Sequence, residues 1–360
     1  MKISNIRILH ITNNLEYGGV QKIIFQLCNG TKDSFDKVIV ASTGGVYVQR
    51  LKEIGIDHFQ IPDVSSKNPK DVIQIIRTLD RLIKKYNINI IHCHHRMAVL
   101  FAKFFSGKVK IIYNNHTIYS DKPLLTHFVL SGIDIIADGV QAKKNVTDYF
   151  GIPDENVTII NNAVDEYDGE YSEIPEIAQR KKRGDFIVLN SARLHPQKGM
   201  NYYIDAARIL IDKGYNISFF IVGDGQLRGE IEKQIEELCL GNYVTLLGFR
   251  KDIKNVIKQA DVLVLTSVYE GLPLTPMEAF SVSRAAIGTD IAGTREVISD
   301  GVNGLLAETK NPVSIAAQIE RLYLDRELLS KLDANAYKTF IEEFSSKPFI
   351  ERYNHFYEGL

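Results

Sequence analysis

The stretch Tyr269-Glu-Gly-Leu-Pro-Leu-Thr-Pro-Met-Glu-Ala-Phe280 closely follows an apolar run, DVLVLT at residues 261–266. A short apolar run bounded by polar residues predicts a buried parallel strand. Pro276 suits the first turn of a helix, where a missing N–H costs nothing. Glu270 is therefore expected just past the carboxyl end of a strand, in the loop that opens a helix. In open α/β sheets that edge binds ligands.

Two carboxylates, those of Glu270 and Glu278, flank this predicted turn. A carboxylate accepts hydrogen bonds from sugar or ribose hydroxyls, and the free N–H groups at the start of a helix suit a phosphate. The same two residues also fit an ordinary loop glutamate and an ordinary helix glutamate. The rest of the chain has to distinguish between these interpretations.

Length and composition indicate an ordinary globular protein. The chain has 360 residues, 45% of them hydrophobic and 24% charged, with a formal net charge of −1. That length suits two α/β domains of about 150–180 residues, and the charge gives no indication of nucleic acid binding. Three cysteines far apart (Cys28, Cys93 and Cys239) predict neither a disulfide framework nor a zinc knuckle.

The N-terminal residues lead into a strand-like run without the h-region of a signal peptide. No apolar run approaches the ~20 residues that span a bilayer. We therefore expect a cytoplasmic protein whose membrane contact, at the inner face of the cell membrane, is peripheral.

Strand-like and helix-like segments alternate twice along the chain. Apolar runs begin near residues 6, 38, 56, 88, 109, 133 and 157, and again near residues 186, 217, 244, 261 and 285. Residues 166–184 are first acidic and then basic, which is typical of a linker. Repeated β-then-α units predict two doubly wound Rossmann-like domains, residues 1–165 and 185–344. Asp71 is the expected cap of a long helix, and residues 300–306 predict a hairpin-like turn with a short strand.

In the second half, four strand-end loops carry polar or glycine residues that would meet along one sheet edge. These loops hold Arg193 with Lys198, Gly223 with Gly225, Gly248 to Arg250, and Glu270 to Glu278. Two fixed cations beside backbone N–H groups suit a diphosphate. Considered singly, Arg193 and Lys198 also fit solvated loop charges.

Collinear motifs across the chain resemble those of the retaining glycosyltransferase family four. The matching pieces are Tyr17-Gly-Gly-Val-Gln21, Ser191-Ala-Arg-Leu-His-Pro-Gln-Lys-Gly199, Val222-Gly-Asp-Gly225, Leu247-Gly-Phe249, Glu270-Gly-Leu-Pro-Leu274 with Glu278-Ala279, and residues 293–304. The resemblance implies the GT-B fold, two Rossmann-like domains facing each other across a cleft. It also implies a nucleotide-sugar donor with a UDP-sugar favoured, retention of configuration, no metal, and a C-terminal helix at residues 345–360 that packs back on the first domain.

The resemblance implies a role for each matching residue. Arg193 and Lys198 would neutralise the donor diphosphate, and Glu270 would contact hydroxyls of the donor sugar. Glu278 would accept the ribose hydroxyls, and His116 corresponds to a histidine near the reacting sugar. Arg193, Lys198, Glu270 and His116 therefore form the expected catalytic set. The other expected donor-binding residues are Gly18, Gly19, Gly223, Gly225, Arg250, Gly271, Leu272, Leu274, Thr275 and Glu278.

Two positions depart from the family pattern, and two other functions stay open. Ala163 stands where the family usually has glycine, and Asp138 where a serine is common. The expected acceptor is a glycan or a lipid-linked saccharide. The alternatives are a nucleotide-sugar epimerase or another GT-B enzyme without a glycosyl acceptor, and an inactive partner subunit. The joint presence of Arg193, Lys198 and Glu270 with Glu278 disfavours the inactive subunit.

His92, His94 and His95 form an H-x-H-H pattern, and imidazole is a common metal ligand. However, no carboxylate or cysteine pair has a companion spacing, and Cys93 would point to the other face of a strand. We therefore expect these histidines to line the cleft and expect no metal.

Basic residues are concentrated in one part of the first half. Residues 67–110 hold ten Lys and Arg against two Asp and Glu, and Arg77, Arg81, Lys84 and Lys85 would share one face of a helix. Such a stripe fits either a solvated helix face or a reversible contact with an anionic membrane.

Overall fold

The computed structural model describes residues 5–360, and the chain divides into two compact units. The first unit contains residues up to Asn162 together with Ser346–Leu360, and the second contains Ala163–Ser345. The expected domain limit at residue 165 thus lies three residues beyond the observed one, and residues 1–4 of the expected first domain lie outside the described part.

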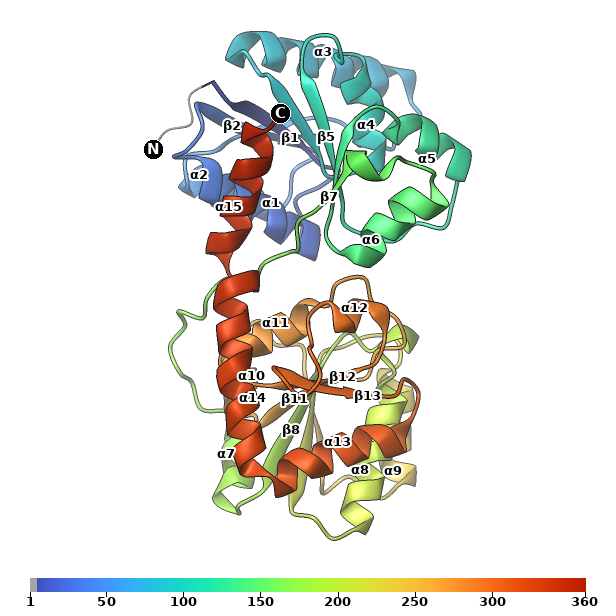
Figure 1. Cartoon of the computed structure of the whole chain (residues 1–360), viewed down its shortest axis with the longest axis vertical. Helices are drawn as coiled ribbons and strands as arrows, with labels where there is room; N and C mark the ends of the chain where they lie inside the picture. Colours follow the sequence, from blue (N-terminus) through green and yellow to red (C-terminus); the bar gives the residue numbers. More distant parts are fainter. Residues whose placement is uncertain (1–4) are drawn as a thin grey trace. The chain divides into compact units, whose positions relative to one another are not determined.

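The first unit is built on a fully parallel sheet of seven strands in the order β3-β2-β1-β4-β5-β6-β7 (Figure 1). The order reverses between β1 and β4, which makes this the point where loops from neighbouring strands diverge. The strands are β1 Arg7–Ile11, β2 Lys37–Ser42, β3 Asp57–Gln60, β4 Ile90–Cys93, β5 Lys110–Asn115, β6 Asp134–Ala137 and β7 Val157–Ile159.

Alternation along these strands sends side chains to two differently covered faces. Leu9, Ile91 and Cys93 belong to a core shared with α3 to α6, whereas His10 and His92 point to the opposite face. The helical segments of this unit are α1 Gly19–Thr31, α2 Tyr47–Glu53, α3 Pro69–Tyr86, α4 Arg96–Lys103, α5 Pro123–Leu130, α6 Val140–Lys144, the π-helical η1 Asn145–Tyr149, the 3-10 turn η2 Asp154–Asn156 and α15 Ser346–Glu358.

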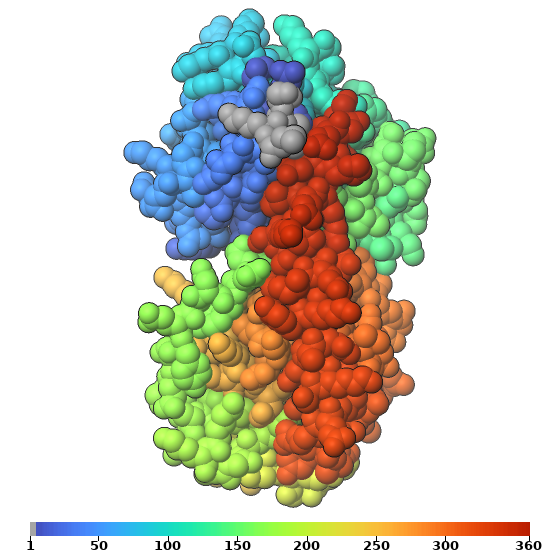
Figure 2. All heavy atoms as spheres, turned by 60° about the vertical axis from the view of Figure 1, so that its left-hand side comes forward, coloured from blue at the N-terminus to red at the C-terminus, as the bar shows by residue number. Residues whose placement is uncertain are grey.

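Helix α15 comes from the far end of the sequence and lies against the first unit (Figure 2). Its contact with His92 shows that it covers the sheet face that carries this residue. Three aromatic side chains, Phe349, Tyr353 and Tyr357, are buried along it. Nδ1 of His92 lies 2.6 Å from the Tyr357 hydroxyl, and Tyr353 donates a hydrogen bond to Asn114. Residues 346–358 therefore complete the core of the first unit.

The second unit repeats the arrangement with six parallel strands in the order β10-β9-β8-β11-β12-β13. Its strands are β8 Phe186–Ser191, β9 Ile217–Val222, β10 Val244–Gly248, β11 Val262–Leu265, β12 Ala286–Thr289 and β13 Gly304–Ala307. Its helical segments are α7 Pro175–Lys182, η3 Pro196–Lys198, α8 Met200–Asp212, α9 Arg228–Glu237, α10 Ile253–Gln259, α11 Leu274–Phe280, α12 Ala292–Arg295, α13 Pro312–Leu324, α14 Arg326–Thr339 and η4 Phe340–Phe344. Two apolar cores, one on each face of the sheet, hold these layers together.

Several local expectations need correction. Residues 166–174 of the predicted linker form neither helix nor strand, whereas α7 follows them, and the segment belongs to the second unit because Ile174 and Ile177 are buried in its core. Helix α3 is capped by Asn68, whose side chain accepts from Lys70 N, and not by Asp71. The predicted turn and short strand near residues 300–306 are present, but strand β13 pairs in parallel with β12, so the expected hairpin pairing is wrong.

The structure also contains a helix, α5, that the sequence pattern did not predict. Several of its apolar side chains point outwards, so it lacks the inward-facing apolar stripe by which helices are recognised.

Candidate active site

The second unit places polar side chains at the point where its strand order reverses, between β8 and β11. The loop after β8 carries Arg193 and Lys198, and the loop after β11 carries Glu270. Since β8 and β11 are neighbours, their carboxyl-end loops meet. In doubly wound sheets, ligands bind at such a switch point.

Lys198 and Glu270 form the centre of this site. Nζ of Lys198 lies 2.5 Å from Oε1 of Glu270, and the side chains are 16% and 9% exposed. The Ser267 hydroxyl donates to the same carboxylate oxygen at 2.6 Å, and Gln197 Nε2 lies 3.5 Å from Oε2. The carboxylate is thus held at both oxygens by groups from two loops.

The backbone of the Lys198 loop is tied to the neighbouring strand end. Thr266 Oγ1 donates to the Lys198 carbonyl at 3.0 Å and accepts from Asn190 Nδ2 at 3.2 Å. Gln197 Nε2 donates to the Tyr269 carbonyl at 2.9 Å. These bonds join the two loops into one rigid support for the Lys198–Glu270 pair.

A pocket of about 350 Å³ opens at the same edge of the sheet, a size that suits a small-molecule ligand. Arg193 lines it from the loop after β8, and Glu278 lines it from helix α11. No hydrogen bond or ion pair holds the Arg193 guanidinium within residues 5–360, so it is free to meet an anion. The lining residues are Ser191, Ala192, Arg193, Val222, Gly223, Asp224, Phe249, Arg250, Ile253, Thr275 and Glu278.

Two glycines permit close backbone approaches at this edge. Gly223 has a φ of +133°, and a Cβ there would lie 1.9 Å from the Ala192 carbonyl oxygen. A Cβ on Gly293 would lie 2.1 Å from the Gly271 carbonyl oxygen and 2.6 Å from that of Glu270. A side chain at Gly223 would therefore displace the loop that carries Arg193, and a side chain at Gly293 would displace the loop that carries Glu270.

The remaining predicted residues of the second unit lie on the same sheet edge. Gly225 follows β9, and Gly271 with Leu272 precedes α11, whose first residues are Leu274 and Thr275. No side chain caps the start of α11, so its first N–H groups keep no side-chain partner there.

Arg250 lines the pocket, but its charge is already engaged. It forms a two-pronged ion pair with Asp252, with contacts of 2.9 and 2.7 Å. This hydrogen bonding lowers the pKa of Asp252 below its ordinary value. Arg250 is therefore better placed to shape the pocket with Phe249 than to neutralise a phosphate.

Three predicted residues, Gly18, Gly19 and His116, belong to the first unit. Gly18 precedes α1 and Gly19 is its first residue, directly after the loop from β1. His116 directly follows β5. These three residues thus belong to a different structural unit from Arg193, Lys198 and Glu270.

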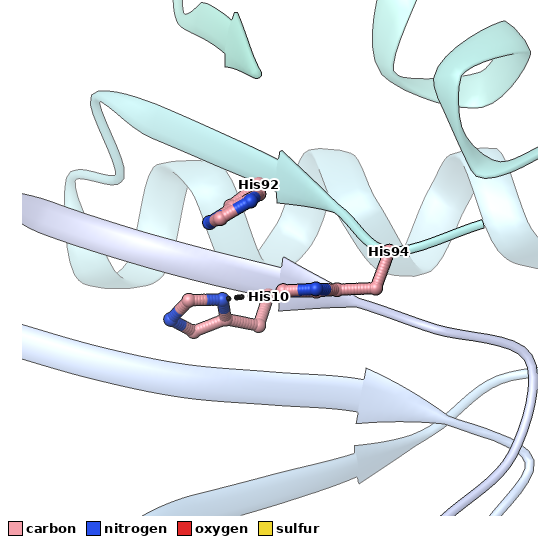
Figure 3. Close-up of side chains that lie close together, drawn as sticks. All are labelled: His10, His92 and His94. Carbon is pink, nitrogen blue, oxygen red and sulfur yellow. Dashed lines mark hydrogen bonds between the residues drawn. The ribbon is translucent and has the colours of Figure 1, made fainter. Parts of the chain in front are cut away.

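His116 belongs to a cluster of histidines at the switch point of the first unit. Nδ1 of His10 lies 3.0 Å from Nε2 of His94 (Figure 3). Nδ1 of His94 lies 3.1 Å from Nε2 of His116. Burial lowers the pKa of His10 to about 3 and of His116 to about 4, and it holds the pKa values of His92 and His94 well below 6.5. All four imidazoles are therefore neutral at pH 7.

The nitrogens of His10, His92 and His94 lie close enough for a metal, within 4.8 Å of one another. However, the His92 and His94 rings stack at a centroid distance of 4.2 Å with an interplanar angle of 29°. Imidazole binds a metal through a lone pair in the ring plane, and two nearly parallel planes do not converge on one ion. Metal binding would require one of these rings to turn, and no buried carboxylate is included in the cluster to offset the charge.

The sequence did not point to several of these residues. Gln197 and Ser267 hold Glu270, yet neither has a spacing that distinguishes it from an ordinary loop residue. His10 lies inside an apolar strand and joins His94 only because β1 and β4 are neighbours.

The surface of the first unit carries an exposed apolar region. Phe104 is 68%, Leu124 86% and Phe128 67% exposed, and with Leu125 they form what we call the α4–α5 apolar surface. Lys103 Nζ lies 5.5 Å from the centre of the Phe128 ring. Among the residues that the structure describes, no helix is long and apolar enough to cross a membrane.

The predicted basic stripe on α3 is exposed at all four residues, Arg77, Arg81, Lys84 and Lys85. Lys84 pairs with Asp80 at 2.6 Å, so its charge is partly offset. Beside the stripe lies a groove of about 500 Å³ lined by Lys70, Ile73, Gln74, Arg77, Thr78 and Arg81.

Two family models match the chain, and together they cover most of it. Residues 17–167 match Glycosyltransferase Family 4, and residues 173–339 match Glycosyl transferases group 1. The first match lies mainly in the first unit and the second match lies entirely in the second.

Individual proteins show the same similarity. The chain is 25% identical over 369 residues to the Escherichia coli UDP-Gal:alpha-D-GlcNAc-diphosphoundecaprenol alpha-1,3-galactosyltransferase, covering 95% of the chain and 94% of that protein. It is 25% identical over 308 residues to the Staphylococcus aureus poly(ribitol-phosphate) alpha-N-acetylglucosaminyltransferase, covering 85% of the chain and 56% of that protein.

Solved structures share the fold at low identity. A glycosyltransferase from Rickettsia africae has a TM-score of 0.85 at 21% identity, covering 99% of the chain and 98% of that structure. The Anabaena protein HepE, solved with UDP and glucose, has a TM-score of 0.81 at 20% identity, with coverage of 99% and 100%.

The chain has two Rossmann-like units, a strand-end site in the second unit, and matches to both family models. It therefore belongs to glycosyltransferase family 4, the glycosyl transferases group 1, and is a glycosyltransferase.

Proposed function

We propose that this enzyme transfers a hexosyl or N-acetylhexosaminyl group from a UDP-sugar to a lipid-linked saccharide, with retention of configuration. The observation that carries the proposal is the second unit's strand-end site, where Arg193 and Glu278 line one pocket and the Lys198–Glu270 pair joins two loops at the same sheet edge. This set combines cations for a diphosphate with carboxylates for hydroxyl groups.

The donor binds with its diphosphate near Arg193 and Lys198. Arg193 is the cation without a protein partner among the described residues that line the pocket, since Arg250 is paired with Asp252. Glu278 accepts hydrogen bonds from the ribose, and Glu270 accepts them from the sugar. The structure of Anabaena HepE, a protein of the same fold, contains UDP and glucose, which supports a UDP-sugar here.

The chemical step depends on stabilising the departing diphosphate. Negative charge grows on the leaving oxygen in the transition state, and fixed cations act where that charge appears. Arg193 and Lys198 supply this stabilisation without a divalent metal. Glu270 is already bonded to Lys198 and Ser267, so it serves better as a holder of sugar hydroxyls than as a nucleophile. The leaving phosphate then accepts the proton of the attacking hydroxyl on the same face of the sugar.

Two relatives support a saccharide acceptor on a phosphate-bearing carrier. One is named for a sugar on diphosphoundecaprenol and the other for poly(ribitol-phosphate). For this chain we propose a lipid-diphosphate-linked saccharide in cell-surface polysaccharide assembly. The α4–α5 apolar surface and the α3 stripe support a peripheral contact with an anionic membrane, through which such a lipid would be reached.

The experiment that tests the proposal is a panel of nucleotide sugars screened by thermal stabilisation, followed by transfer to saccharides on diphosphate lipids. UDP-sugars should give the largest stabilisation, and release of UDP should require the acceptor. NMR of the product made from an α-linked donor should show an α linkage. Acceptor-independent release or conversion of the donor would favour an epimerase, and a β linkage would reject retention.

A further inference from the structure

Three histidines form a hydrogen-bonded row that ends at His116. The row runs from His10 through His94 to His116, with nitrogen–nitrogen distances of 3.0 and 3.1 Å. Ring centroids are 5.2 and 5.4 Å apart, much farther than the bonded nitrogens. The rings therefore meet edge to edge, as hydrogen bonding requires, and not face to face as stacked rings do.

The ring nitrogens of His94 and His116 make different contacts. His94 uses Nε2 for His10 and Nδ1 for His116, and its own backbone N–H is bonded to the Ile11 carbonyl at 2.8 Å. His116 uses Nε2 for His94. Within residues 5–360 its Nδ1 has no hydrogen-bond partner, and this atom is not fully shielded from solvent. Nδ1 is therefore the nitrogen of His116 that can meet a ligand.

The row also restricts the protons. A neutral imidazole has one donor nitrogen and one acceptor nitrogen. In a row of neutral rings, every hydrogen bond must therefore run in the same direction from one ring to the next. Burial keeps the rings neutral, because no charged group in the cluster repays the cost of desolvating an imidazolium. The tautomer of His116 is thus coupled to those of His94 and His10.

We propose that His94 is a positioning residue that engages Nε2 of His116 and thereby presents Nδ1 of His116 to a hydroxyl of the reacting sugar. This inference rests on the proposed function, in which His116 lies near the donor sugar. A hydroxyl both donates and accepts, so a neutral imidazole of defined tautomer can bind it without adding charge beside the diphosphate.

Two substitutions of His94 separate the positioning role from a structural one. Asparagine places an amide where Nδ1 stands and keeps a partner for His116, while it loses the contact with His10. Glutamine reaches the position of Nε2, so it keeps the contact with His10 and leaves His116 without a partner. Both replace a buried imidazole by a neutral amide, which makes them matched controls for each other.

The primary measurement is the ¹⁵N–¹H NMR spectrum of the full chain labelled in histidine, with His116 assigned by its loss in His116→Ala. In the wild type, the His116 nitrogens should show one neutral tautomer from pH 5.5 to 8. His94→Asn should keep that pattern and a near-wild-type kcat/KM. His94→Gln should average the two nitrogens and lower kcat/KM about tenfold, the value of one ordinary hydrogen bond.

Three results would overturn the inference. These are a His116 that titrates or averages in the wild type, equal kcat/KM for the two His94 variants, and stoichiometric Zn²⁺ binding by the wild type that both variants lose. The last result would assign His10, His92 and His94 to a metal. The NMR pattern is measured without substrate, so a wild type that shows it but transfers no sugar would count against the proposed function instead.

Discussion

Lys198 Nζ lies 2.5 Å from Oε1 of Glu270, and this contact joins the loop after β8 to the loop after β11. The pair is largely shielded from solvent. Removing either side chain would therefore leave the charge of the other without its partner. In the proposed mechanism, diphosphate binding by Lys198 and sugar binding by Glu270 therefore share one contact.

We expect Lys198→Ala and Glu270→Ala each to lower kcat/KM by on the order of 10²–10³, as for other groups that stabilise developing charge. Because the two side chains act as a unit, the double variant should be little worse than the poorer single variant. Steady-state kinetics with a saturating acceptor would measure this cycle.

The control cycle uses Arg208 and Asp212, an exposed ion pair on α8. Alanine at either or both of these positions should leave kcat/KM near wild type. Multiplicative losses at Lys198 and Glu270 would show instead that the two residues act independently.

Arg193→Ala should lower turnover on the order of 10²–10³ while the fold stays intact, because its guanidinium, which lines the pocket, is proposed to neutralise the diphosphate. Circular dichroism and the thermal midpoint would check the fold. Arg228→Ala is the matched control, since Arg228 is engaged with Glu232 at 2.9 Å. Near-wild-type rates for both Arg193→Ala and Lys198→Ala would refute the diphosphate assignment.

Chelation should leave activity unchanged. The proposed mechanism neutralises the diphosphate with Arg193 and Lys198 and uses no ion. Activity after exhaustive dialysis against EDTA, compared with activity after adding back Mg²⁺ or Mn²⁺, measures this directly. Activity that strictly requires either ion would contradict the metal-free mechanism.

Acid should destabilise the first unit through its histidines. In the unfolded chain, histidine side chains take up protons near pH 6.5. In the folded chain, burial lowers the pKa of His116 to about 4 and that of His10 to about 3. Between pH 6.5 and 4 the unfolded state binds more protons, so the free energy of unfolding falls as the pH falls. Each such histidine contributes about 1.4 kcal/mol per pH unit over that window.

His92→Asn tests the size of this effect. Asparagine keeps an amide near the Tyr357 hydroxyl, 2.6 Å from Nδ1 of His92, and removes a buried Nε2 that has no partner. Urea unfolding from pH 7 to pH 5 should show a shallower loss of stability in the variant than in the wild type. Parallel curves would mean that His92 is protonated equally in both states.

The membrane proposal predicts flotation with anionic but not neutral liposomes, and less flotation as salt rises. Replacing Arg77, Arg81, Lys84 and Lys85 by Glu should abolish it, since each basic residue near an anionic surface contributes about 1 kcal/mol. Leu124→Ser with Phe128→Ser should weaken it without changing the charge, because both side chains are exposed and apolar.

Lys233→Glu, on the exposed face of α9 in the second unit, is the charge control. It should float like the wild type. Equal recovery of the wild type with neutral and anionic vesicles would favour a soluble acceptor instead.

The sequence predicted the elements that apolar runs define, and it predicted the site wherever loops follow those runs. Strands such as β8 and β11, and the placement of Lys198 and Glu270 after them, follow from local pattern. The His10–His94–His116 row could not be predicted, because it depends on the lateral order β1, β4, β5, which residue spacing does not encode. Helix α5 escaped prediction because several of its apolar residues, among them Leu124 and Phe128, face outwards.

The position of α15 has a consequence for synthesis of the protein. Its aromatic residues Phe349, Tyr353 and Tyr357 fill a face of the unit that is otherwise built from residues made first. During translation, the sheet of β1 to β7 emerges with that face uncovered, and it stays so until residues 346–358 have left the ribosome. The second unit can close on its own before then. The half that begins the chain is therefore the half that finishes folding last.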